Sequence, residues 1–250
     1  MLLANDVKWP WVGGCIKLSD YDALYDALRH IMPTMARMLG SHTPLNLRIQ
    51  HEHRAWEYAS AVACAMHLPP GALVLDVGAG LGLFGPVVAH SLRLRVIEVD
   101  QDVSYAKYRR PVVEWITANG GHMEIKQLNL LATPPEAHDM VTCLSVAEHV
   151  LPDDQEDFWR VLAKNVAPSG WLVCTVDYQV GGAAAINEDD REVLYTADQV
   201  RQACAWLEDE GLVVGPIDYA DGEALVANYT FFRLAAYRPA QEVAWDENVS

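Results

Sequence analysis

From residue 72 onward, short apolar runs alternate with longer segments in which apolar residues recur at every third or fourth position. The short runs are typical of strands buried in a sheet, and the longer spacing is typical of amphipathic helices. The runs predict strands at residues 73–77, 94–99, 123–128, 140–144, 171–176, 212–217 and 229–237. Helices are expected at residues 102–118, after Asp153 or Asp154, and after a capping box of Thr196 and Gln199. This alternation predicts a Rossmann-like, doubly wound α/β fold with a mostly parallel sheet.

The two ends of the chain depart from this alternation. The last two predicted strands follow one another without a helix between them, so they are expected to be antiparallel neighbours. Near the N-terminus, helical spacing predicts two helices, the second over residues 51–68, and the Pro-Pro-Gly of residues 69–71 marks a boundary. We therefore predict an N-terminal helical segment (1–70) laid on a main domain (71–240), followed by an acidic tail (241–250).

The bulk composition limits the class of partner. With 250 residues, 51% of them hydrophobic, the chain can form one large domain with a sizeable core. Its net charge of −16 disfavours a polyanion such as DNA or structured RNA. The basic cluster at residues 107–110 is interpreted as a solvated helix face. The expected partner is therefore a small-molecule substrate rather than a nucleic acid.

Cellular location and metal binding can be addressed in the same way. The five cysteines are odd in number and contain no CxxC pair, which indicates reduced thiols rather than a disulfide framework or a zinc site. No apolar run approaches the ~20 residues that span a bilayer, and the first residues lack the pattern of a signal peptide. His51 and His53 are two positions apart on a predicted helix and do not face together, so no metal site is expected. We expect a cytoplasmic protein without membrane contacts.

The most specific motif lies in residues 72–82, with the sequence ALVLDVGAGLG. A strand-like run ends in Asp76 and enters a turn that contains Gly78, Gly80 and Gly82. Glycine permits positive φ angles and lets a ligand approach the backbone closely. The helix that follows offers N–H groups with no partner inside the helix. The combination is typical of a strand–turn–helix unit that binds a nucleotide cofactor.

Two cofactors are compatible with this turn. The pattern Gly80-x-Gly82-x-x-Gly85, with Asp100 twenty residues after Gly80, matches the dinucleotide motif and favours NAD or FAD. When Asp76 is included, the motif becomes Asp-x-Gly-x-Gly-x-Gly, which resembles motif I of the class I S-adenosylmethionine (SAM) methyltransferases. A carboxylate suits a cofactor that carries ammonium and sulfonium groups, and it is a poor neighbour for a pyrophosphate. Charge therefore favours SAM, while an ordinary glycine-rich turn is the third interpretation.

The resemblance to class I methyltransferases extends over about residues 72–237. Residues 139–150 resemble the family's fourth-strand segment, which ends in Glu-His-Val, although His138 replaces the usual aromatic residue before Asp139. Residues 168–170 resemble the Pro-Gly-Gly turn into the fifth strand, and residues 195–212 resemble a late helix–strand unit. The family's sheet has seven strands, with a reversed last strand inserted beside the fifth. We expect the same architecture here.

The resemblance implies a cofactor site at the carboxyl ends of the strands. Asp76 is expected to orient the turn or to meet the ammonium group of SAM. The backbone under the methionine and ribose part of SAM is expected to come from Gly78, Ala79, Gly80 and Gly82.

Asp100, at the end of the second strand, is expected to accept hydrogen bonds from both ribose hydroxyls, because a carboxylate has two acceptor oxygens. The alternatives are that Asp100 caps the helix expected from residue 102, or that Glu98, on the same strand face, competes for the ribose. The other implied cofactor residues are Gln101, Asn129 and Leu130 around the adenine, and Leu144 and Ser145 at the methionine end.

The same resemblance implies how the reaction proceeds. Direct in-line displacement at a sulfonium methyl gives S-adenosylhomocysteine and depends mainly on alignment of the reacting atoms. His149 is the candidate catalytic base, because imidazole titrates near neutral pH, but a structural role and a site without any base are the alternatives. Residues 54–58 and the long segment 178–195 are expected to help form the acceptor pocket.

Two other function classes stay open. An NAD(P)-binding oxidoreductase is supported by the dinucleotide pattern and by the position of Asp100, and it would ignore SAM. A non-catalytic scaffold with a SAM-type fold would bind SAM weakly or not at all. No motif identifies the acceptor, so methylation at oxygen, nitrogen or carbon is equally compatible with the sequence.

Overall fold

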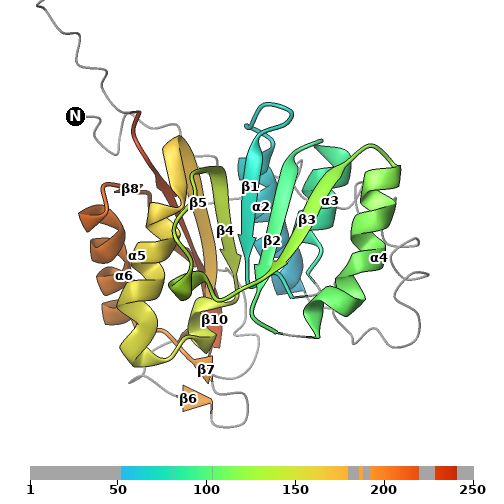
Figure 1. Ribbon diagram of the computed structural model, residues 1–250. Helices are drawn as coiled ribbons and strands as arrows, with labels where there is room; N and C mark the ends of the chain where they lie inside the picture. Colours follow the sequence, from blue (N-terminus) through green and yellow to red (C-terminus); the bar gives the residue numbers. More distant parts are fainter. Residues whose placement is uncertain are drawn as a thin grey trace, which may run out of the picture.

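A central sheet organises the described part of this computed structural model, which comprises residues 52–80, 82–102, 104–179, 186–187, 192–219 and 229–240 (Figure 1). Its strands are β1 (Leu73–Val77), β2 (Arg95–Asp100), β3 (His122–Gln127), β4 (His138–Leu144), β5 (Val166–Gln179), β8 (Val213–Val214), β9 (Asp218–Tyr219) and β10 (Tyr229–Tyr237). The strand order is β3-β2-β1-β4-β5-β10-β8, and β9 also pairs with β10. Strands β1 to β5 are parallel, and β10 is antiparallel to β5, β8 and β9.

The strand order reverses between β1 and β4. The chain moves outward from β1 to β2 and β3 and then returns to β4 on the other side of β1. In open α/β sheets, ligands bind outside the carboxyl ends of the strands at such a reversal. The predicted doubly wound sheet, with a reversed last strand beside the fifth, is confirmed.

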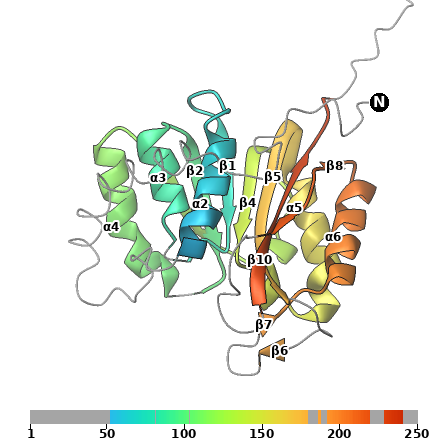
Figure 2. The ribbon, with the colours of Figure 1, turned by 180° about the vertical axis from the view of Figure 1, so that it is seen from behind.

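Helices cover both faces of the sheet. One face packs against α2 (Glu52–Ala65), α3 (Phe84–Ser91) and α4 (Tyr105–Ala118), which Figure 2 shows from in front. The other face packs against α5 (Gln155–Lys164) and α6 (Ala197–Asp209). Successive strand residues alternate between the two cores: Val74 faces the first set of helices, and Leu75 and Val77 face the second. This double burial explains why the strands form continuous apolar runs.

The prediction of one strand over residues 212–217 is wrong. The segment forms two short strands, β8 and β9, and both pair with β10, so the sheet has eight strands instead of seven. Between them lie Gly215 and Pro216, and proline has no N–H group to donate to a neighbouring strand.

The fifth strand begins earlier than residue 171. β5 already includes Val166, which is in register with His138 on β4, and the register shifts between His138 and Met140. Ser169 has a φ angle of +64° within this stretch. The predicted turn at residues 168–170 is therefore an irregularity inside a long strand rather than the connection that precedes it.

Several predictions fall on residues that the structure does not describe. They are the first helix of the N-terminal segment, the residue His51, one of the five cysteines (Cys15) and the tail 241–250. The proposed division at residues 70 and 240 therefore stays a prediction. Among the described helices, none has the length and apolar character that crossing a membrane requires.

Candidate functional site

The glycine turn that joins β1 to α3 lies at the reversal of the strand order. Gly78 and Gly80 have φ angles of +65° and +48°, in the left-handed region that favours glycine. A Cβ atom on Gly78 would lie 2.5 Å from Cγ2 of Val146, so a larger residue does not fit there. On Gly80, the nearest described atom would be the Gly78 carbonyl oxygen, 3.9 Å away. Among the described residues, the turn is packed at Gly78 and open at Gly80, where a ligand could approach the backbone.

Asp100 contacts this turn directly. The Gly80 N–H donates to Asp100 Oδ2 at 3.0 Å, and the Asp102 N–H donates to Oδ1 at 2.9 Å. Each carboxylate oxygen keeps a second lone pair, so the half-exposed group can still accept from a ligand diol. The alternative that Asp100 caps α4 is wrong, because the N-cap of that helix is Ser104.

Asp76 is buried and links β1 to β4. The Thr142 hydroxyl donates to Asp76 Oδ1 at 2.7 Å. Burial, together with the nearby Glu98 carboxylate, raises the pKa of Asp76 from 3.8 to about 7, although the Thr142 hydrogen bond and Arg109 oppose the shift. Asp76 was predicted either to orient the turn or to meet the ammonium group of SAM, and its buried position supports the first role.

Arg109 overturns the interpretation of residues 107–110 as a solvated helix face. Its neighbours Lys107 and Arg110 are exposed, but Arg109 is fully buried because this position of α4 faces the glycine turn. Its Nε atom donates to Glu98 Oε2 at 2.7 Å, its Nη2 atom pairs with Glu98 Oε1, and Nη2 also donates to the Gly82 carbonyl at 2.6 Å. Arg109 therefore ties α4 to β2 and to the turn.

Glu98 is consequently not a competitor for a ribose. Its carboxylate is fully buried and paired with Arg109. A Cβ atom on Gly85 would overlap Glu98 Oε1, so the missing side chain at Gly85 makes room for the carboxylate. In the sequence Glu98 stands out as a charged residue in an apolar strand, but no local pattern marks Arg109 as its partner, and the pairing itself required the fold.

On the other side of the turn, α2 contributes Glu57. This fully buried carboxylate accepts hydrogen bonds from Thr175 Oγ1 at 2.8 Å and from the Ser145 hydroxyl. Ser145 has a φ angle of +53°, which is unusual for a residue with a side chain. Tyr58, the next residue of α2, places its hydroxyl 3.3 Å from where a Cβ on Gly82 would lie. The predicted involvement of residues 54–58 thus has two specific contacts near the turn.

The remaining predicted cofactor residues lie where strands β2, β3 and β4 end. Gln101 is exposed, and Leu144 is half-buried. Asn129 accepts a hydrogen bond from Leu131 N at 3.0 Å and caps the short 3₁₀ helix η4 (Leu130–Ala132). The fold therefore brings the predicted residues to one edge of the sheet, but their contacts with a cofactor stay predictions.

The candidate base His149 and its neighbour Glu148 lie in different environments. Both residues belong to the 3₁₀ helix η5 (Ala147–His149), where His149 is exposed and Glu148 is buried. Burial and the nearby Asp177 carboxylate raise the pKa of Glu148 well above its ordinary value, and its Oε2 atom has no hydrogen-bond partner among the described residues. Burial thus favours the neutral form of Glu148, and His149 is the exposed member of the pair.

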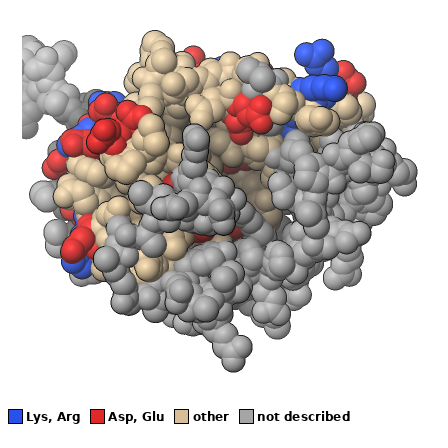
Figure 3. Space-filling view, turned by 90° about the horizontal axis from the view of Figure 1, so that it is seen from below, with Lys and Arg blue, Asp and Glu red and all other residues tan. Residues whose placement is uncertain are grey.

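Of segment 178–195, the described residues are 178–179, 186–187 and 192–195, and some of them contact β5 and the helix η5 that follows β4. The Gln179 N–H donates to the Tyr195 carbonyl and the Tyr195 N–H donates to the Asp177 carbonyl, both at 2.9 Å. Its described part includes the hairpin of β6 (Ile186–Asn187) and β7 (Glu192–Val193), and β7 packs against η5. In the view onto this edge of the sheet, acidic side chains are visible toward the middle of the face (Figure 3). A role of the segment in an acceptor pocket stays a prediction.

Comparison with known sequences finds similarity to methyltransferases. Residues 75–172 match a family model described as a methyltransferase domain. Ubiquinone biosynthesis O-methyltransferases from Albidiferax ferrireducens and Chromobacterium violaceum are 34% and 33% identical over 109 and 106 residues. These matches cover 42% and 41% of this chain, and the chain spans only 42% and 43% of the two relatives. The family-model match therefore includes the glycine turn, and each of the two relatives matches less than half of the chain.

Solved structures resemble a larger part of the chain. Magnesium protoporphyrin IX methyltransferase from Synechocystis PCC 6803, solved with bound SAM, has a TM-score of 0.58 at 17% identity and covers 89% of this chain and 98% of its own. Geranyl diphosphate methyltransferase, in complex with SAM, has a TM-score of 0.61 at 17% identity, with coverages of 81% and 94%. The [4+2]-cyclase SpnF has a TM-score of 0.63 at 14% identity, with coverages of 87% and 94%. At these identities the likeness concerns the fold, and a fold can support different reactions.

Proposed function

We propose that this chain, whose residues 75–172 match a methyltransferase domain and whose sheet has the class I methyltransferase fold, is a SAM-dependent methyltransferase acting on a small molecule. The observation that carries the proposal is the contact between Asp100 and the glycine turn. The carboxylate accepts from Gly80 N–H and keeps free lone pairs at the carboxyl edge of the sheet. This arrangement suits a ligand that has a ribose diol next to a group lying over the turn.

The residues around the turn fit SAM in charge and shape. Among the described residues the side of Gly80 is open, and the half-exposed Asp100 carboxylate lies beside it, whereas the Glu98 charge is offset by Arg109 and the pKa of Asp76 is raised to about 7. A partly negative environment favours the ammonium and sulfonium of SAM over the pyrophosphate of a dinucleotide. Asp100 would hold the ribose, and the other proposed cofactor contacts are Gly78, Ala79, Gly80, Gly82, Gln101, Asn129, Leu130, Leu144 and Ser145.

SAM would supply a methyl group on a sulfonium, and its direct in-line transfer to the acceptor would leave S-adenosylhomocysteine. The protein's contribution is then mainly to hold the turn rigid and to align the acceptor. We keep His149 as the candidate base, since it is the exposed member of the η5 pair. Buried Glu148 would support the walls of the pocket, because burial favours its neutral form and disfavours the charged carboxylate.

The acceptor is proposed to be a small molecule, bound between the carboxyl edge of the sheet and segment 178–195. The net charge of −16 disfavours polyanionic acceptors. We further propose a cytoplasmic location. Its support is that Cys143 and Cys174, which lie opposite each other in register on β4 and β5, are free thiols.

The first test is calorimetric titration of the full chain with SAM, S-adenosylhomocysteine, NADH and NADPH in parallel. Binding of the first two compounds alone supports the proposal. Binding of a nicotinamide cofactor alone would establish the oxidoreductase alternative. If SAM binds but no acceptor panel yields S-adenosylhomocysteine, the chain uses the fold for another reaction or as a scaffold.

The role of Asp100 can be separated from the fold with a matched pair of variants. Asp100→Ala should weaken SAM binding by about tenfold or more, which corresponds to about 1.4 kcal/mol. Asp102→Ala removes an exposed carboxylate two residues away and should leave SAM affinity within about twofold. Unchanged SAM affinity in a folded Asp100→Ala protein would contradict the ribose assignment.

A further inference from the structure

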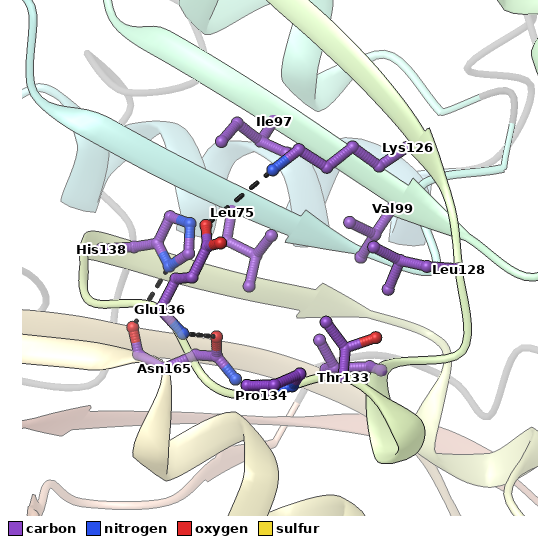
Figure 4. A pocket seen from close by; sticks show the side chains of 11 residues that line it. Leu75, Ile97, Val99, Lys126, Leu128, Thr133, Pro134, Glu136, His138 and Asn165 are labelled. Carbon is purple, nitrogen blue, oxygen red and sulfur yellow. Dashed lines mark hydrogen bonds and ion pairs between the residues drawn. The ribbon is translucent and has the colours of Figure 1, made fainter.

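An open groove lies on the sheet face opposite the glycine turn's helices (Figure 4). It encloses about 330 Å³ of empty space, its open mouth included. Leu75, Ile97 and Val99 form its floor on β1 and β2, and Leu128 and Pro134 belong to its wall. The groove exists because the connection between β3 and β4 contains only the short helix η4, which leaves this part of the face without a covering α-helix.

His138, the first residue of β4, lies at one end of this apolar groove. The residue is only 2% exposed, and its Nδ1 atom lies 3.4 Å from the Asn165 carbonyl oxygen. A carbonyl can only accept, so Nδ1 carries the proton. Burial lowers the pKa of His138, against the backbone hydrogen bonds of Glu136 and Asn165, and so favours the neutral ring, in which an unprotonated Nε2 is an acceptor. Among the described residues, Nε2 has no hydrogen-bond partner.

The surrounding residues fix the shape of the groove. The Asn165 side chain donates to the Val161 carbonyl at 2.8 Å and accepts from the Glu136 N–H at 3.0 Å, which holds the wall in place. At the mouth, Lys126 Nζ lies 3.8 Å from Glu136 Oε2, so the two charges offset each other. The groove therefore offers apolar surface and, at His138, a buried acceptor without a partner among the described residues, while the opposite charges at its mouth offset each other.

We propose that this groove is a binding site for a small neutral molecule with an apolar body and one O–H or N–H group, which donates to His138 Nε2. A buried acceptor without a partner is unfavourable, and a ligand donor would satisfy it. The apolar floor would cover the body of the same molecule. An aromatic residue, the usual one at position 138 in the resembling family, would have no such acceptor. The site lies across the sheet from Asp100, and Leu130 is the residue that it shares with the proposed cofactor set.

The test compares phenol with anisole, which has the same ring but no donor. Nitrogen NMR of the histidines in the full-length chain should show His138 Nε2 unprotonated, and phenol at up to about 10 mM should shift this resonance, as expected for a ligand of about seven non-hydrogen atoms. Anisole should bind about tenfold more weakly. His138→Phe should abolish the preference for phenol, whereas His122→Phe, which changes an exposed histidine on β3, should keep it.

Three results would overturn the proposal. The first is a His138 resonance that phenol leaves unmoved, which would mean that water alone satisfies the acceptor. The second is equal binding of phenol and anisole in the unmodified chain, a result that does not depend on whether the variants fold. The third is displacement of phenol by S-adenosylhomocysteine in direct competition, which would make the groove part of the cofactor site.

Discussion

At the scale of single residues, the buried pair of Glu98 and Arg109 is the most consequential feature of the site. Both side chains are fully removed from water, and the guanidinium also holds the Gly82 carbonyl. Burying two charges is unfavourable, and their mutual attraction offsets that cost only while both are present. The geometry of the glycine turn therefore depends on an interaction that neither residue can supply alone.

Replacing Arg109 tests this dependence. Arg109→Met should lower the free energy of unfolding by about 3–5 kcal/mol, because it leaves the Glu98 carboxylate buried without its cation. The double variant Glu98→Gln/Arg109→Met should recover a large part of the loss. Urea denaturation measures both, and Arg110→Met, at the exposed neighbouring position, should change stability by less than about 0.5 kcal/mol. Equal losses in the single and double variants would contradict the pairing argument.

Asp76 predicts a pH dependence of stability. Its pKa is raised from 3.8 to about 7 in the folded protein, so the folded state binds a proton more tightly than the unfolded state. The resulting stabilisation is fully present below pH ~4 and is lost as the pH rises through about 7. Glu148, whose pKa is also raised, acts in the same direction.

A neutral analogue isolates the Asp76 contribution. Between pH 5 and pH 8 the unmodified chain should lose about 3 kcal/mol of stability through this group. Asp76→Asn keeps an acceptor for Thr142 and should lose correspondingly less over the same interval. Chemical denaturation at both pH values provides the measurement, with Asp153→Asn as the exposed control. The same pH slope in Asp76→Asn and the unmodified chain would show that Asp76 titrates normally.

At the scale of elements, α2 matters because it reaches across the sheet to residues far away in sequence. Glu57 accepts from Ser145 and Thr175, which are 88 and 118 positions further along the chain. The helix itself was predictable from its apolar spacing, and so were the five parallel strands. The contacts of Glu57 were not, because they depend on which strand ends lie beneath the helix after folding.

Substitutions at Glu57 separate its acceptor role from its charge. Glu57→Leu should lower stability by about 1–3 kcal/mol, because the Ser145 and Thr175 hydroxyls lose a buried acceptor. Glu57→Gln keeps a carbonyl oxygen and should lose less. Glu114→Leu, at an exposed position of α4, serves as the helix control in the same urea titrations. A loss in Glu57→Gln as large as in Glu57→Leu would mean that the charge, rather than the hydrogen bonding, is what α2 contributes.

At the scale of the whole molecule, the last strand, β10, is inserted into the sheet between β5 and β8. β10 pairs with β5 over nine residues and separates it from β8, and its Phe232, Leu234 and Ala235 are buried in the two cores. The absence of a helix before the last strand predicted its antiparallel pairing with the preceding strand, and the resemblance to class I methyltransferases implied its place beside the fifth. The split of the penultimate strand and the burial of Arg109 escaped prediction, because local patterns do not encode partners distant in sequence.

Truncations test the contribution of β10. A chain that ends at residue 228 loses the strand and leaves the β5 edge and both cores exposed, so it should fail to give a cooperative unfolding transition. A chain that ends at residue 240 keeps every contact described above and should unfold cooperatively. Circular dichroism during thermal and urea unfolding distinguishes the two. A cooperative transition in the shorter chain would mean that the parallel strands form an independent folding unit.

The packing of Gly85 against Glu98 also constrains how this protein can change over generations. A side chain at position 85 would collide with the Glu98 carboxylate. Loss of either Glu98 or Arg109 would leave the other charge buried without its partner. Substitutions at positions 85, 98 and 109 should therefore appear together in descendants of this chain, and lineages with a small neutral residue at position 98 should be free to vary at the other two. Gly85, the third glycine of the apparent dinucleotide pattern, would then be retained because of the buried Glu98 carboxylate. It would not indicate an ancestor that bound a pyrophosphate.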